Sequence, residues 1–188
     1  SWDEAALGYN AYSLFLTGKD EYGITLPVIL KSFGDYKPGI YSYLTVPAIA
    51  ALGMTELTTR LPAALAGILL IAAVYLLTRR IAPALILAVN PWAIQFSRAA
   101  WEANVCLLFT VLGAVLFMRR RFYASALFFG LTFWTYQGAK LFTPLILLTL
   151  VITHAPSLNW RRLVKPLLVL VMLLSPILLG LSSQSGRL

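Results

Sequence analysis

The chain has 188 residues, of which 60% are hydrophobic and 12% are charged, and its formal net charge is +8. Soluble domains are about 45–50% apolar and about 25% charged, so both values favour a protein whose solvent is lipid. The basic residues stand in short clusters between apolar runs, as in the loops of membrane proteins, which excludes nucleic acid as their expected partner.

The first part of the chain, residues 1–57, holds six of the seven acidic residues and no uncharged run long enough to cross a bilayer. We expect a large extramembrane loop with internal structure. Residues 3–17 are predicted to form an amphipathic helix along the membrane surface, followed by a polar turn at 18–23. A second short helix is predicted at 41–52, ending at Gly53. The residues that recur at helical spacing in the first helix are Ala5, Tyr9, Tyr12 and Leu16.

Six uncharged runs follow, and we expect each to span the membrane as a helix. They cover residues 61–77, 81–97, 103–118, 122–139, 141–153 and 166–186. Several are close to the lower limit of about 17 residues, which predicts tilt or extra turns of helix. The expected fold class is all-α: a polytopic transmembrane bundle over residues 58–188, with a structured first outer loop that carries interfacial helices.

Charge predicts the orientation of this bundle. Alternate loops contain eight basic residues and no acid, whereas all seven acids lie in the opposite loops. The eight are Arg79, Arg80, Arg119, Arg120, Arg121, Arg161, Arg162 and Lys165. By the positive-inside rule this set is cytoplasmic, so residues 1–57 face the periplasm or the exterior of the plasma membrane. No charge falls in mid-membrane, which disfavours an ion pathway through this part.

Cofactor and metal motifs are not expected. Cys106 is the only cysteine and His154 the only histidine. Charge places His154 on the cytoplasmic side, away from the acids, so we expect no metal site built from His and Cys. There is also no phosphate-binding glycine loop, serine elbow or zinc motif.

The first candidate site residues on the outer face are Asp3 and Glu4. Acidic residues favour a helix N-terminus, where they cap N–H groups and meet the positive end of the dipole. A carboxylate at the membrane surface can equally take a proton from an acceptor hydroxyl. The two interpretations are compatible.

A second cluster contains Lys37, held by a turn at Pro38, with Tyr41 close by. A lysine point charge beside interfacial tyrosines suits a phosphate at headgroup level. The alternative is an interfacial loop with a snorkelling lysine.

A third cluster joins the second and third runs. Arg98 could grip phosphate oxygens, and Glu102 could be a second acid or orient Arg98. Four residues apart on a helix, they would also make an ordinary ion pair. Tyr136, with its neighbours Gln137 and Lys140, could line a headgroup pocket or belong to an interfacial belt. Arg60 is predicted to be an interfacial anchor at a helix start.

Several motifs, in this order, resemble the GT-C membrane glycosyltransferases. The resemblance is greatest to the branch (family 39-like) that contains protein O-mannosyltransferases and bacterial aminoarabinose transferases. The motifs are Trp2-Asp3-Glu4-Ala5, Gly18-Lys19-Asp20-Glu21-Tyr22-Gly23, Lys37-Pro38, Tyr41-Ser42-Tyr43-Leu44, Arg60-Leu61-Pro62, Asn90-Pro91 and Ser97-Arg98. Where the family often has Lys-Pro-Pro, this chain has a glycine after Lys37-Pro38.

The resemblance implies a polyprenyl-phosphate sugar donor and inversion at the anomeric carbon. Asp3 matches the family's first-loop acid and Lys37 its phosphate-contacting lysine, while Glu102 matches the second acidic position by topology. We therefore expect Asp3 and Glu102 to be catalytic, and Glu4, Lys37, Tyr41, Arg98 and Tyr136 to bind substrate. It also implies about eleven or more spans, so we expect a first helix and a C-terminal half beyond this chain.

Two other functions also fit a basic, aromatic outer cavity. One is a transporter or flippase for a lipid-linked anion, which predicts charged or broken helices near mid-membrane. The other is a non-catalytic membrane scaffold in which Asp3 is only a helix cap. The sugar, and whether the acceptor is a protein, a lipid or a glycan, are left open.

Overall fold

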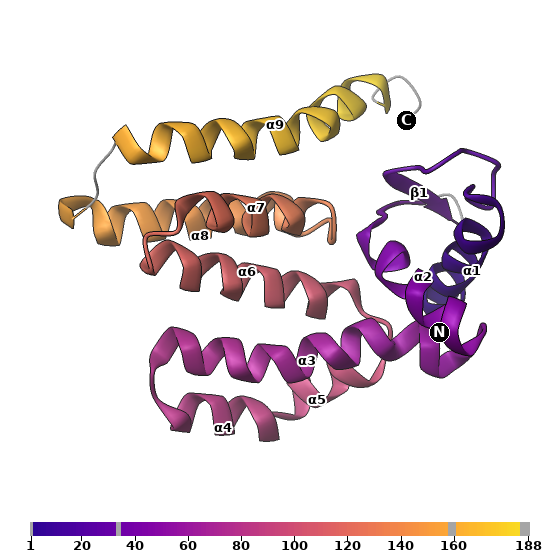
Figure 1. The fold of residues 1–188 in the computed structure, drawn as a ribbon, viewed down its shortest axis with the longest axis horizontal. Coiled ribbons are helices and arrows are strands. Elements are labelled where there is room, and N and C mark those ends of the chain that lie inside the picture. The colour runs from indigo at the N-terminus through magenta and orange to yellow at the C-terminus, as the bar shows by residue number, and fades with distance from the viewer. Residues whose placement is uncertain (1, 33–34, 158–160, 185–188) are drawn as a thin grey trace.

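The computed structural model describes residues 2–32, 35–157 and 161–184, and these form an α-helical bundle with one small hairpin (Figure 1). The helices are α1 (Trp2–Thr17), α2 (Ile40–Leu52), α3 (Glu56–Thr78), α4 (Ile81–Val89), α5 (Pro91–Arg98), α6 (Glu102–Met118), α7 (Phe122–Phe133), α8 (Ala139–His154) and α9 (Arg161–Gln184). A short 3-10 turn, Ala155–Ser157, follows α8. The strands are β1 (Ile29–Ser32) and β2 (Asp35–Pro38), paired antiparallel.

The long helices stack in one direction, with α6 between α3 and α7, and α9 against the far side of α7 (Figure 1). Helices α1 and α2 and the hairpin gather at one end of this stack. The predicted all-helical class is confirmed, and so are the two helices predicted at 3–17 and 41–52. The hairpin was not predicted.

Helix α3 has mostly small side chains inside and large ones outside. Its buried positions recur every three or four residues and are Thr59, Ala63, Ala66, Leu70 and Ala73. Leu65, Ile68 and Leu69 are at least half exposed. Small residues let helices approach closely where lipid removes any hydrophobic drive between them, so this pattern suits a helix surrounded by hydrocarbon.

The second predicted span, residues 81–97, is broken into α4 and α5. Asn90 caps α5 by accepting from the N–H groups of Trp92 and Ala93, at 2.9 and 3.3 Å. Pro91 stands at the first helical position, where its missing N–H costs nothing. Together these residues start a new helix in place of continuing the old one.

The predicted count of six spans is therefore not confirmed. Among the described residues, α3 is the one helix long and apolar enough to cross a bilayer by itself. The pair α5 and α6 would make a second span, with a bend of 118° between them. Helices α7 and α8 are apolar but have 12 and 16 residues, and at about 1.5 Å per residue neither reaches the roughly 30 Å of a bilayer core.

Helix α1 buries a different face from the one whose spacing predicted it. Leu7, Ala11 and Leu14 are buried, whereas Tyr9 and Leu16 of the predicted stripe are more than half exposed. The buried face packs on α2 and reaches α3. The exposed stripe is free to meet a membrane surface, and that contact stays a prediction.

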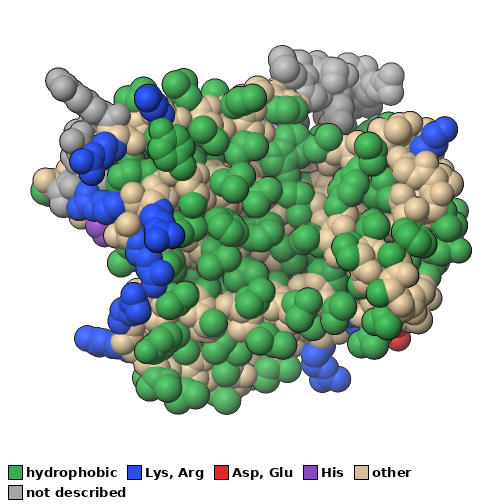
Figure 2. Space-filling view, in the orientation of Figure 1, with side chains coloured by type: hydrophobic (Ala, Val, Ile, Leu, Met, Phe, Trp, Pro, Cys, Tyr) green, Lys and Arg blue, Asp and Glu red, His purple; other side chains and the backbone are tan. Residues whose placement is uncertain are grey.

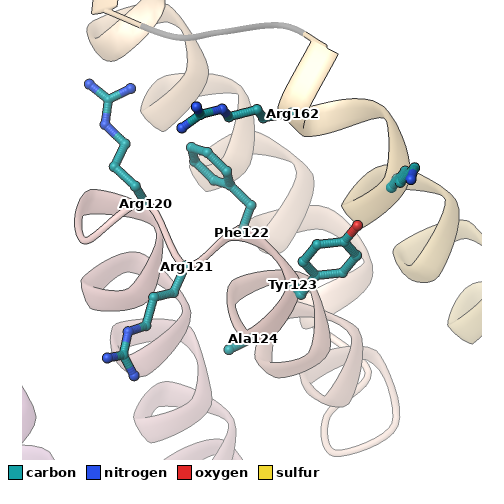
Figure 3. A pocket seen from close by; sticks show the side chains of 7 residues that line it. Arg120, Arg121, Phe122, Tyr123, Ala124 and Arg162 are labelled. Carbon is teal, nitrogen blue, oxygen red and sulfur yellow. The ribbon is translucent and has the colours of Figure 1, made fainter.

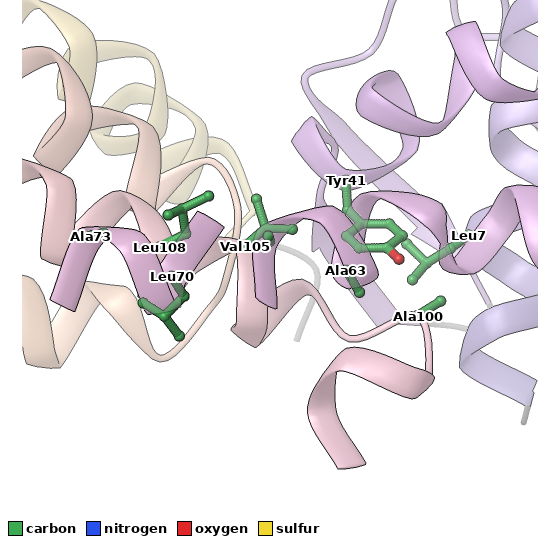
Figure 4. Packing of buried hydrophobic residues seen from close by; sticks show 9 residues of the cluster. Leu7, Tyr41, Ala63, Leu70, Ala73, Ala100, Val105 and Leu108 are labelled. Atoms are coloured by element: carbon green, nitrogen blue, oxygen red, sulfur yellow. The ribbon is translucent and has the colours of Figure 1, made fainter. Parts of the chain in front are cut away.

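One core cluster joins this end of the molecule to the bundle. The ring of Tyr41 lies between Leu7 of α1 and Ala63 of α3, with Ala100 beside them (Figure 4). The cluster continues along α3 and α6 through Leu70, Ala73, Val105 and Leu108. The N-terminal segment is thus packed on the bundle through hydrophobic contacts.

Basic side chains gather at one end of the helix stack. Figure 2 shows a row of basic side chains down one end, over the turns α3–α4 and α6–α7 and the start of α9. The described side chains of this group are Arg79, Arg80, Arg119, Arg120, Arg121, Arg162 and Lys165. Apolar side chains cover most of the face between this end and the N-terminal elements.

Candidate functional site

An ion pair joins the first turn of α1 to strand β2. The ammonium of Lys37 donates to Oδ1 of Asp3, 34 residues away in sequence. The side chain of Asp3 is 55% exposed and that of Lys37 is 18% exposed. The carboxylate is thus open to a molecule arriving from outside, and the lysine beside it is largely covered.

The hairpin fixes Lys37 in place. In the antiparallel register Leu30 faces Lys37 and Ile29 faces Pro38, and Leu30 is buried. Lys37 therefore lies in a strand, which corrects the predicted proline turn. At the end of β2, Gly39 donates its N–H to the carbonyl of Val28 at 3.0 Å.

The connection between α7 and α8 forms hydrogen bonds with β2 and with the start of α2. The side-chain amide of Gln137 donates to the carbonyl of Tyr36, and the N–H of Ile40 donates to the carbonyl of Trp134 at 3.2 Å. Lys140 in turn donates to the side chain of Gln137 at 2.9 Å. Tyr136, which is exposed, belongs to this connection, whose hydrogen bonds are with Tyr36 and Ile40.

Glu4 has a different environment from its neighbour Asp3. Its carboxylate accepts from Nε and Nη2 of Arg60, at 2.8 and 3.2 Å, and from the N–H of Ala100 at 2.9 Å. The paired guanidinium of Arg60 lowers the pKa of Glu4 to about 2. The charged group thereby ties α1 to α3 and to the loop before α6. A direct contact of Glu4 with substrate stays a prediction.

Tyr41 is fully buried, and its hydroxyl donates to the carbonyl of Thr59 at 2.9 Å. Burial raises the pKa of Tyr41, and the negative charges of Glu102 and Glu4 add to the rise. In this conformation Tyr41 is part of the core, and its expected contact with substrate is untested.

Arg98 and Glu102 belong to different helices. Arg98 ends α5 and Glu102 begins α6, across the 118° bend, so the ordinary pairing of residues four apart on one helix does not apply. Arg98 is exposed and lines a cavity of about 210 Å³ together with Ser97 and Asn104. Glu102 is half-buried. The loop between them carries Ala100, whose N–H donates a hydrogen bond to Glu4 of α1. This contact brings Arg98 and Glu102 to the end of the bundle where α1 lies.

Arg60 was missed as a site residue of this region, and the contact that Gln137 makes with β2 was not predicted. Arg60 was predicted to anchor a helix start, but α3 begins at Glu56 with Thr55 as its cap, which places Arg60 one turn inside. Arg60 also pairs with Glu56, four residues earlier, and that spacing was the available signal. Gln137, which holds β2, has no comparable signal because its partner lies 101 residues away.

The arrangement places an accessible carboxylate next to a covered ammonium. Such a site can hold an anion at the lysine and accept a proton at the aspartate. No group of three or more His, Cys, Asp or Glu side chains that would hold a metal occurs within the described parts of the chain.

The fold is similar to that in the crystal structure of ArnT from Cupriavidus metallidurans in the apo state, with a TM-score of 0.71 and 16% sequence identity. The match covers 98% of this chain and 38% of the ArnT chain. No family model matches the chain, and no curated protein matches it. The expected resemblance is thus confirmed for the fold.

Proposed function

We propose that this chain is part of a plasma-membrane glycosyltransferase that moves a sugar from a polyprenyl-phosphate donor to an acceptor hydroxyl. In this proposal residues 1–57 face the periplasm or cell exterior, and residues 58–188 are the membrane bundle. The chain spans 38% of the ArnT chain, so the activity proposed is that of the whole protein.

The observation that carries the proposal is the ion pair between Asp3 and Lys37. Its two residues come from different elements, and 34 positions separate them in sequence. Asp3 is 55% exposed, and an ion pair with a solvent-exposed carboxylate contributes little to stability, about 0–1 kcal/mol, so stability alone is a weak reason for this arrangement. Transfer from a phosphate-linked sugar requires a cation for the phosphate and a proton acceptor for the incoming hydroxyl, and these two residues can supply both.

The ion pair between Asp3 and Lys37 suggests the order of the steps in the transfer reaction. A donor phosphate competes with Asp3 for the ammonium of Lys37, and binding it there frees the carboxylate. Asp3 then takes the proton of the acceptor hydroxyl while the acceptor oxygen forms its bond to the anomeric carbon. The bond from that carbon to the phosphate oxygen breaks on the opposite face, so the configuration inverts.

Charge stabilisation follows the same geometry. Positive charge develops on the sugar ring and negative charge stays on the departing phosphate, which needs no general acid. Lys37 stabilises this phosphate, and we assign Arg98 a second contact with it. Glu102 is assigned the role of a second carboxylate near the sugar, and Tyr136 that of an aromatic wall beside Lys37.

Glu4 holds Asp3 in position. Because its oxygens already accept three hydrogen bonds from Arg60 and Ala100, it fixes the first turn of α1 on the bundle. Asp3, one residue earlier, is therefore held at a defined place beside Lys37.

The test is a transfer assay on membranes that contain the full-length protein and a labelled polyprenyl-phosphate sugar. Asp3→Asn should lower transfer by about 100-fold or more, within the usual contribution of a general base, with insertion and expression unchanged. The matched control is Glu21→Gln, which removes an exposed acid from the same N-terminal region. Substantial transfer by Asp3→Asn rules out the base. Movement of donor without transfer by the wild type would favour a transporter instead.

A further inference from the structure

A basic cavity of about 590 Å³ lies at the opposite end of the bundle, between the α6–α7 turn and the start of α9 (Figure 3). Four of its seven lining residues are cations and two are aromatic. The lining residues are Arg120, Arg121, Phe122, Tyr123, Ala124, Arg162 and Lys165. Figure 3 shows that Arg120 and Arg162, from two different elements, extend beside the ring of Phe122.

The positive charge of this cavity has no nearby match in the sequence. No aspartate or glutamate follows Glu102, so α7, α8 and α9 and their connections carry only basic charges. Orientation in a membrane needs such charges in the loop but does not need them around a hollow. Arginine and lysine side chains around a cavity of this size suit a phosphate group, because one guanidinium can donate hydrogen bonds to two phosphate oxygens at once.

A second cavity, of about 340 Å³, adjoins the first, since Phe122 lines both. Its walls come from α6, α7, α8 and α9 and are almost wholly apolar. Helix α9 divides its side chains between the two: Arg162 and Lys165 line the basic cavity, and Leu163, Val164 and Leu167 line the apolar one. A basic cavity that continues into an apolar one suits a molecule with an anionic headgroup and a hydrocarbon tail.

We propose that these joined cavities bind an anionic phospholipid, with its phosphate among Arg120, Arg162 and Lys165 and an acyl chain against Phe122 and Leu167. Free phosphate shares the headgroup chemistry but leaves the apolar cavity empty. By the positive-inside rule this end of the bundle faces the cytoplasm, and the cytoplasmic leaflet of the membrane contains anionic lipids. The site lies away from Asp3 and Lys37 and does not rest on the proposed transfer reaction.

The test uses native mass spectrometry of the full-length protein in a neutral detergent. Phosphatidylglycerol, phosphatidylcholine, glycerol phosphate and inorganic phosphate are titrated separately. We expect phosphatidylglycerol to bind more tightly than the other three. The double variant Arg162→Gln/Lys165→Gln should weaken phosphatidylglycerol binding by about tenfold, since each basic residue near an anionic lipid contributes an appreciable share of the affinity.

The matched control is Arg79→Gln/Arg80→Gln, which removes two charges from the same end of the bundle but outside both cavities. It should leave phosphatidylglycerol binding within about twofold of wild type. Unchanged weak binding of phosphatidylcholine verifies that both variants are folded. The proposal is overturned if both doubles lose affinity equally, if neither does, or if inorganic phosphate or glycerol phosphate binds as tightly as phosphatidylglycerol.

Discussion

The guanidinium of Arg60 holds the carboxylate of Glu4 at two points, with the donor atoms 2.8 and 3.2 Å from the oxygens and 56 residues of chain between them. The side chain of Glu4 is 13% exposed. Arg60 also reaches the carboxylate of Glu56, which is 71% exposed. One cation therefore makes two ion pairs in very different surroundings, and this allows a direct comparison.

Replacing Glu4 with Gln should destabilise the protein by about 1–3 kcal/mol, because a largely buried carboxylate that accepts two hydrogen bonds from Arg60 is lost. Glu56→Gln breaks only the exposed pair and should cost less than about 0.5 kcal/mol. Chemical unfolding in detergent, followed by circular dichroism, measures both. Equal effects would show that the contact between α1 and α3 does not depend on Glu4.

The same pair predicts a pH dependence. The pKa of Glu4 falls from 4.5 in the unfolded chain to about 2 in the folded one. Between these values the unfolded state binds more protons, so stability rises with pH there. The contribution is complete above about pH 4.5 and is lost as the pH falls towards 2. Glu4→Gln should show a smaller loss of stability over this range than wild type, and identical pH profiles would contradict the assignment.

Much of the helical architecture is predictable because the signals are local. Helical spacing and Gly18 bound α1, and Gly53, with a φ of 77°, ends α2. The broken second span is also local in origin, but its apolar composition concealed the cap at Asn90. The uncharged run was interpreted as one span because length and hydropathy outweighed the proline.

The site was predictable in its residue types more than in its contacts. Asp3 and Lys37 were identified separately, and only the fold makes them a pair. The hairpin that carries Lys37 has strands of four residues each and no strong alternation of polar and apolar residues. Arg60 was missed as a partner of Glu4 because 56 residues separate them and no spacing rule connects such positions.

Arg79 offers a test of backbone strain at the end of α3. It adopts φ 55°, a left-handed conformation that costs a residue with a side chain about 1–2 kcal/mol and glycine almost nothing. Arg79→Gly should therefore stabilise the protein by about 1 kcal/mol in an unfolding titration. Arg80, at φ −127°, is the control, and Arg80→Gly should give no gain. A loss on Arg79→Gly would show that its side chain matters more than its backbone.

Close packing of α3 against α5 depends on Gly67. A Cβ there would lie 2.9 Å from the Cβ of Ser97 and closer still to its hydroxyl oxygen. That hydroxyl is fixed by bonds to Ala93 and Asn104. Overpacking costs about 1–3 kcal/mol, which exceeds the gain of about 1 kcal/mol from alanine's helix propensity.

Gly67→Ala should accordingly destabilise the protein. Adding Ser97→Ala to it removes the contact with the hydroxyl and should recover about half of the loss or more. Thermal unfolding of the two single variants and the double variant measures this coupling. Additive effects would mean that Gly67 and Ser97 do not oppose each other across the helices.

The most direct test of the central claim exchanges the two charges of the proposed site. In the double variant Asp3→Lys/Lys37→Asp the ion pair can still form, so a purely structural pair predicts normal stability and normal function. We expect stability close to wild type but transfer from a labelled polyprenyl-phosphate sugar reduced by about 100-fold or more, because base and phosphate contact have changed places. Transfer at the wild-type rate by the exchanged variant would contradict the account.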